Sequence, residues 1–167
     1  MRPRASSQFE VFLSCRLKGS HRLAVVGVGD VVSPFDRLGM YSAGEIEKLH
    51  LANIKVFFAG TVPERITATL RAYRPDHVIF LDAADMGGLP GTIEVIEPEW
   101  VQKNLFSSHV LPLSVVMEFI AEDTGSGVTL LGIQPDIMRP DRVLSGGGLK
   151  LLHRNLSALA HILRICR

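Results

Sequence analysis

The chain has 167 residues, a net charge of +1 and a hydrophobic content of 47%. This length is typical of one domain spanning residues 1–167, and a chain of this size buries roughly 70% of its unfolded surface. Such a chain needs neither disulfides nor a metal ion to fold. The near-neutral charge gives no general attraction to nucleic acid, and the composition argues against disorder.

Cysteine usage and hydropathy indicate a cytoplasmic protein. The two cysteines, Cys15 and Cys166, lie near opposite ends and form no metal-binding pattern, so structural zinc and a disulfide framework are not expected. Free thiols suit a reducing compartment. No apolar run approaches the roughly 20 residues of a membrane span, so we expect no membrane insertion.

The first 20 residues are predicted to be a basic N-terminal extension or an edge strand. Residues 11–17 are short, mostly apolar and rich in residues that favour strands. Contact of this arm with the phosphates of nucleic acid or of a membrane is the alternative, and a solvated terminus plus one edge strand is the favoured interpretation. The basic residues of the stretch 1–22, set against Glu10 alone, are Arg2, Arg4, Arg16, Lys18 and Arg22.

The remaining elements alternate along the chain. Apolar runs predict strands, helical spacing predicts helices, and the order indicates a three-layer α/β/α sandwich around a mixed, mostly parallel sheet of about five strands. Sites in such folds lie beyond the carboxyl ends of the strands. The expected strands are 23–29, 54–59, 77–82, 92–96 and 127–133, and the expected helices are 39–51, 63–72, 111–121 and 149–165.

Two glycine-rich segments invite a nucleotide-binding interpretation. Gly27-Val28-Gly29 follows a strand, but Val32 stands where a third small residue is needed, and no acidic residue ends the next strand. A tight strand exit explains the glycines, although a nucleotide-dependent α/β enzyme stays an alternative. The segment 145–148 lacks the Gly-Lys-Ser/Thr of a P-loop and is interpreted as a loop and N-cap.

Acidic residues and histidines supply the candidate chemistry. Asp82 and Asp85 follow a buried strand, where they suit metal binding or proton transfer, although one of them capping a turn is an equal alternative. His109 precedes a helix, and Asp36 lies in the loop after the first apolar strand. Taken alone, neither His109 nor Asp36 indicates a functional site. Other histidines lie inside apolar patterns and are interpreted as packed or surface residues: His77, His153 and His161.

Four separated motifs together resemble the [NiFe]-hydrogenase maturation endopeptidases, most closely their hydrogenase 3 branch. The resemblance runs from about residue 23 to residue 163. It lies in the order and spacing of the motifs, each of which is modest alone. They are Gly27-Val28-Gly29-Asp30 with Asp36 and Gly39, the stretch from Val78 to Gly91, Ser108-His109-Val110-Leu111-Pro112-Leu113, and Leu131-Gly132-Ile133-Gln134-Pro135-Asp136.

The resemblance implies catalytic and metal-binding roles for Asp36, Asp82 and His109. It implies removal of a C-terminal peptide from the hydrogenase large-subunit precursor after nickel insertion, with the nickel supplied by that substrate and used for recognition. The expected state is a monomer or weak oligomer. Asp30 replaces the family's usual asparagine. Arg37 departs from the pattern too, which allows it either to pair with Asp36 or to contact an acidic substrate group. A non-catalytic module that binds the nickel-loaded precursor is the alternative function.

Overall fold

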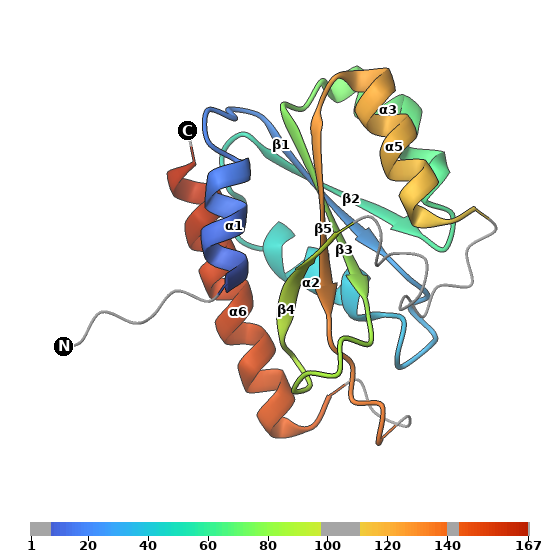
Figure 1. The fold of residues 1–167 in the computed structure, drawn as a ribbon, viewed down its shortest axis with the longest axis vertical. Helices are drawn as coiled ribbons and strands as arrows, with labels where there is room; N and C mark the ends of the chain where they lie inside the picture. Colours follow the sequence, from blue (N-terminus) through green and yellow to red (C-terminus); the bar gives the residue numbers. More distant parts are fainter. Residues whose placement is uncertain (1–7, 98–110, 140–143, 167) are drawn as a thin grey trace.

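The structure is a computed structural model that describes residues 8–97, 111–139 and 144–166. Its strands form one sheet (Figure 1), and each predicted strand from residue 23 onward is confirmed to within one residue at either end. The strands are β1 (Leu23–Val28), β2 (Ile54–Gly60), β3 (His77–Ala83), β4 (Ile93–Ile96) and β5 (Gly127–Ile133). The described helices are α1 (Gln8–Arg16), α2 (Leu38–Glu47), η1 (Pro63–Ile66, a 3-10 turn), α3 (Thr67–Tyr73), α5 (Leu113–Thr124) and α6 (Gly146–Ile165).

The sheet is mixed and mostly parallel, as predicted. Its order is β2-β1-β3-β5-β4. Strand β1 pairs in parallel with β2 and β3, β3 pairs in parallel with β5, and β4 runs antiparallel to β5. The carboxyl ends of the four parallel strands therefore meet at one edge of the sheet, which we call the carboxyl edge.

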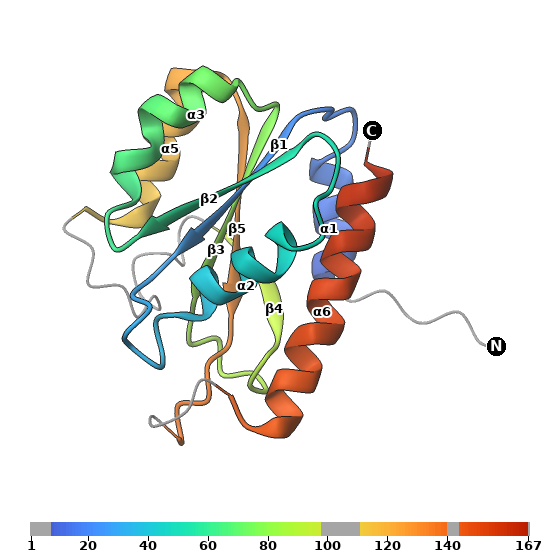
Figure 2. The same cartoon turned by 180° about the vertical axis from the view of Figure 1, so that it is seen from behind.

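Helices cover both faces of the sheet, so each central strand is buried on two sides. Alternate strand residues enter different clusters: Val25 and Ile79 pack with α1, α2 and α6, whereas Val26 and Phe80 pack with α3 and α5. Figure 2 shows α2 and α6 together on one face. Burial on both faces explains why these strands are continuously apolar in sequence. No helix in the described ranges is long and apolar enough to span a membrane.

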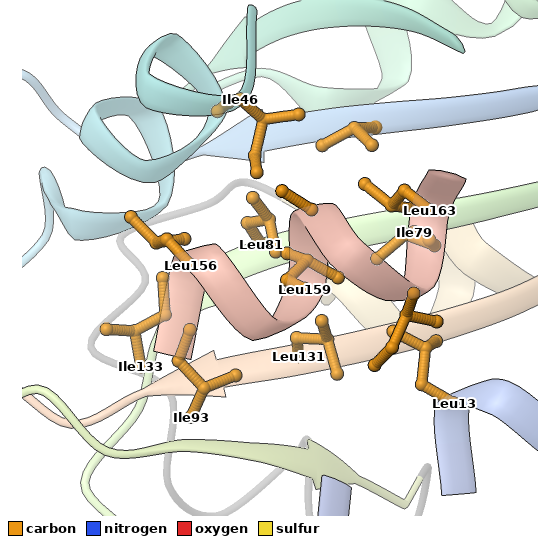
Figure 3. Packing of buried hydrophobic residues seen from close by; sticks show 14 of the residues in the cluster. Leu13, Ile46, Ile79, Leu81, Ile93, Leu131, Ile133, Leu156, Leu159 and Leu163 are labelled. Atoms are coloured by element: carbon orange, nitrogen blue, oxygen red, sulfur yellow. The ribbon is translucent and has the colours of Figure 1, made fainter. Parts of the chain in front are cut away.

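Helix α6 supplies much of the first cluster. Leu156, Leu159 and Leu163 project from α6 toward the sheet, where Ile79, Leu131 and Ile133 belong to the same cluster (Figure 3). Asn155 on the same helix donates from Nδ2 to the carbonyl oxygen of Gly91, at 3.0 Å. Helix α6 therefore packs on the sheet of its own chain.

The N-terminal segment is the clearest departure from the predicted elements. The prediction of an edge strand over 11–17 is wrong, because residues 8–16 form the helix α1. Phe9, Leu13 and Leu17 are buried at intervals of four residues, whereas Val11 and Phe12 are exposed. A spacing of four marks one face of a helix, and burial of that face outweighs the strand preference of valine and phenylalanine.

The start of α6 also differs from the prediction. The helix begins at Gly146 rather than residue 149, with Ser145 at its N-cap position and no side-chain capping bond. Gly148 faces Pro90, and a Cβ added at Gly91 would overlap the carbonyl oxygen of Gly148. The glycines therefore allow the first turn of α6 to lie directly against the turn that follows β3.

Candidate active site

The loop between β1 and α2 folds back onto the end of β1 and buries Asp36. Gly29 has φ +124°, and a Cβ at this position would overlap the carbonyl oxygen of Asp36. The Asp36 side chain is buried, and its Oδ2 accepts a hydrogen bond from the Asp30 N–H at 3.0 Å. Only glycine suits both this positive φ and this close approach, which explains Gly29 better than a nucleotide site does.

Asp82 lies in β3, next to its last residue, at the carboxyl edge. It is fully buried, pairs with Gly132 of the neighbouring strand, and its Oδ1 accepts from the Ala83 N–H at 2.8 Å. Burying a carboxylate is costly, so a buried acid at a strand end is a candidate for function.

A close contact at Gly39 brings the two aspartates to the same edge. A Cβ at Gly39 would overlap the carbonyl oxygens of Val28 and Leu81. The first turn of α2 therefore sits directly on the ends of β1 and β3. Asp36 lies just before this turn and Asp82 directly follows Leu81, so both carboxylates lie where α2 meets the carboxyl edge.

The structure separates the roles of the two acids that follow β3. Asp85 is only half-buried, and its Oδ1 accepts from the Gly87 N–H at 3.1 Å and from Gln134 Nε2 at 3.2 Å. Asp85 therefore stabilises the turn after β3, which was one of the two alternatives for this pair. Asp82 keeps the interior position.

Gln134 is a structural residue of the site whose contacts the sequence does not reveal. Its side chain is buried, and its Oε1 accepts from the N–H groups of Met86, at 2.6 Å, and Gly88, at 3.3 Å. Its backbone also bonds to Gly91 and Thr92. Gln134 thus joins the loop after β3 to the end of β5. Its place in the fourth motif was the only indication in the sequence.

The third predicted site residue, His109, lies outside the described residues. Within the parts that are described, no group of three or more His, Cys, Asp or Glu side chains could hold a metal ion. The other histidines behave as predicted. His77 is buried with Nε2 2.8 Å from Thr129 Oγ1, His153 contacts Tyr41 through a 2.8 Å hydrogen bond, and His161 is exposed.

A hollow of about 700 Å³ lies at the opposite edge of the sheet. It is bordered by Arg22, Lys55, Arg74 and Asp76, beside the amino ends of β1, β2 and β3. The N–H groups of His21 and Arg22 both bond to Asp76 and hold the pKa of its carboxyl below the usual range. This hollow is separated from Asp36 and Asp82 by the length of the strands, so the buried aspartates rather than the hollow define the candidate site.

Comparison with known proteins agrees with this architecture. The model of the HycI hydrogenase maturation protease family matches residues 40–147. The hydrogenase 3 maturation protease of Escherichia coli K12 is 33% identical over 112 residues, which cover 66% of this chain and 71% of that protein.

Solved structures share the fold. The [NiFe] hydrogenase maturation protease HycI from Thermococcus kodakarensis KOD1 gives a TM-score of 0.77 at 28% identity, over 92% of this chain and 99% of that one. The solution structure of the endopeptidase HycI from Escherichia coli gives 0.70 at 27% identity, over 84% and 90%. The predicted resemblance is confirmed: this chain belongs to the hydrogenase maturation protease family and is an endopeptidase.

Proposed function

We propose that this protein removes a C-terminal peptide from the large-subunit precursor of a [NiFe] hydrogenase after nickel has been inserted. The observation that carries the proposal is the placement of two buried carboxylates, Asp36 and Asp82, at the carboxyl edge of a protease of this family. In this proposal His109 completes the site.

The donor chemistry fits a nickel ion presented by the substrate. Carboxylate oxygens and an imidazole nitrogen suit a borderline divalent ion, and three protein donors leave positions open for groups of the substrate. Asp36 is held in place by the Asp30 N–H, and Asp82 by its place in β3. Both carboxylate groups are therefore positioned before the substrate arrives, which lowers the entropic cost of binding it.

In the proposed mechanism, the carboxylates at the carboxyl edge promote hydrolysis of the peptide bond. A water molecule attacks the scissile carbonyl carbon, and a carboxylate or the charge of the ion assists its loss of a proton. The new C–O bond forms, the C–N bond breaks, and the proton passes to the leaving amine. A positioned general base contributes about 10²–10⁴-fold to such a step.

The test compares nickel-loaded and nickel-free precursor after incubation with the purified protein, by intact mass. We expect loss of a C-terminal peptide from the nickel-loaded form only. Asp36→Asn, Asp82→Asn and His109→Ala should each slow the loss about 100-fold or more, because the first two replace an anionic, basic carboxylate by a neutral amide and the third removes the imidazole.

Asp85→Asn is the matched control, because it also removes a carboxylate near the end of β3. Its retained Oδ1 can still accept from Gly87 and Gln134, so processing should continue at close to the wild-type rate. Binding of the nickel-loaded precursor without any change in its mass would contradict the proposal and indicate the binding module or a different substrate. Equal cleavage of both precursor forms would contradict the role of nickel.

A further inference from the structure

Large apolar side chains are unusually exposed around the candidate site. Among the residues that the structure describes, the three most exposed are Met138, Val32 and Leu89, with 85%, 82% and 73% of their surface accessible. Single exposed apolar residues are common on protein surfaces. What distinguishes these three is their location, because they come from three different loops at one edge of the sheet.

Each of these loops follows a strand that ends at the carboxyl edge. Val32 follows β1, Leu89 follows β3 and Met138 follows β5, and these strands are neighbours in the order β1-β3-β5. The arrowheads of all three strands point toward this end of the molecule in Figure 1. We call the three side chains the apolar rim. Val31 and Ile137, beside two of its members, are also exposed.

The rim and the candidate catalytic residues share their loops. Val32 lies between β1 and Asp36, and Leu89 lies in the loop that begins directly after β3, the strand that carries Asp82. The loops after β3 and β5 are joined by Gln134. A polypeptide that brings a peptide bond to the two carboxylates therefore has to pass over this edge.

Local hydrogen bonds fix turns in the loops of the rim. The Val32 N–H donates to Asp30 Oδ1 at 2.9 Å, the Thr92 N–H donates to the carbonyl of Leu89 at 3.0 Å, and the Arg139 N–H donates to the carbonyl of Asp136 at 3.1 Å. Turns fixed in this way keep apolar side chains in water instead of letting them pack inward. Exposed apolar surface beside a site is typical of a surface that a partner covers.

We propose that the apolar rim binds an apolar stretch of the precursor polypeptide next to the scissile bond. This inference rests on the proposed function and adds a specificity determinant to it. The rim makes its contacts in the bound ground state and the transition state alike, so weakening it should raise KM and leave kcat unchanged.

The experiment measures kcat and KM for the nickel-loaded precursor with Val32→Ser, Leu89→Ser and Met138→Ser, singly and combined. Each single change should raise KM about 3- to 10-fold, in line with the loss of one buried apolar contact at an interface. The triple variant should raise KM more than any single change. In all of them kcat should stay within about twofold of wild type, as expected when only uniform binding is lost.

Ile165→Ser and Val11→Ser are the matched controls. Ile165 and Val11 are 60% and 56% exposed, and they lie on α6 and α1 rather than on the loops of the carboxyl edge. Their KM should equal that of wild type. Unchanged KM in the triple rim variant, or an equal rise in the controls, would overturn the inference.

Two further results separate this inference from the proposed function. If the wild-type protein cleaves no precursor, the rim can still be tested by binding. Bio-layer interferometry then compares binding of the nickel-loaded precursor to the wild-type protein and to the triple variant. Equal binding by both would then overturn it. Light scattering addresses a second copy of this chain as the occupant. A wild-type dimer that the triple variant loses, with KM unchanged, would assign the rim to self-association instead.

Discussion

His77 is an ionisable side chain inside the sheet, and its surroundings keep it neutral. The imidazole is buried, its Nε2 lies 2.8 Å from Thr129 Oγ1, and the cross-strand neighbour Gly127 has no side chain that would displace the ring. Burial, with a smaller contribution from the charge of Arg16, lowers the pKa of His77 from 6.5 to about 4.

This residue should make stability depend on pH. As pH falls from about 6.5 to about 4, the unfolded chain takes up a proton at His77 that the folded chain does not. The free energy of unfolding should therefore fall by about 1–3 kcal/mol across this window and be insensitive to His77 above it. Urea denaturation at a series of pH values measures the slope. His77→Gln can still bond to Thr129 but cannot ionise, so it should flatten this part of the profile. An unchanged slope would show that other groups cause it.

At the scale of the element, the contact of α2 with the sheet positions the candidate site. Gly27 and Gly39 form this contact: a Cβ at Gly27 would lie 2.7 Å from Ala43 Cβ, and one at Gly39 would overlap two strand carbonyls. Gly27 belongs to the segment Gly27-Val28-Gly29, which resembled a nucleotide motif in sequence. In the structure this glycine serves helix packing. The sequence shows that glycines follow a strand, but it does not show which backbone approaches them.

Two glycines of α2, Gly39 in the contact and Gly44 outside it, allow a matched test on one helix. Gly39→Ala should destabilise the protein by about 1–3 kcal/mol, as overpacking does, and should slow processing because α2 shifts away from Asp36 and Asp82. Gly44→Ala lies on the same helix with nothing within 4 Å of the new Cβ. It should instead stabilise by about 0.5–1 kcal/mol and leave processing intact. Thermal unfolding and precursor cleavage measure both effects. Stabilisation by both variants would show that helix propensity, not the strand contact, dominates.

Helix α1 shows how far local sequence preference can mislead. Residues 11–17 favour a strand on propensity, and Phe9, Leu13 and Leu17 favour a helix on spacing. The tertiary contacts decide between them, because α1 packs its buried face into the cluster of α6 and the sheet. The five later strands were predictable because burial on both faces leaves little ambiguity in an apolar run.

At the scale of the whole molecule, two apolar clusters on opposite faces of the sheet hold the fold together. We therefore expect folding to be independent of nickel, and chelation of the purified protein should leave its melting temperature unchanged. A tightly bound resident metal would stabilise by about 2.7 kcal/mol at 100 times its Kd, so its removal would lower the melting temperature by several degrees. Scanning calorimetry before and after chelation distinguishes the two cases. Chelation of the loaded precursor, in contrast, should abolish processing.

The candidate site was predictable only in part, because most of what positions it is three-dimensional. The placement of Asp82 at the carboxyl edge follows from its strand, whereas Asp36 stood out only through the family resemblance. The remaining features depend on the conformation of loops, which the periodicity of the sequence does not predict. They are the hydrogen bond from the Asp30 N–H to Asp36, the hydrogen bonds of Gln134 and the apolar rim. The catalytic and metal-binding roles of Asp36, Asp82 and His109, and a single domain over residues 1–167, stay predictions.

The bond that holds Asp36 bears on how sequences of this kind can diverge. The N–H that grips its carboxylate belongs to the main chain of residue 30, whereas the Asp30 side chain accepts separately from the Val32 N–H. Aspartate and asparagine both offer that accepting oxygen, so the exchange at position 30 leaves both bonds intact. Only proline lacks the N–H. Mutation can therefore change the charge beside this carboxylate over generations without loosening the carboxylate itself.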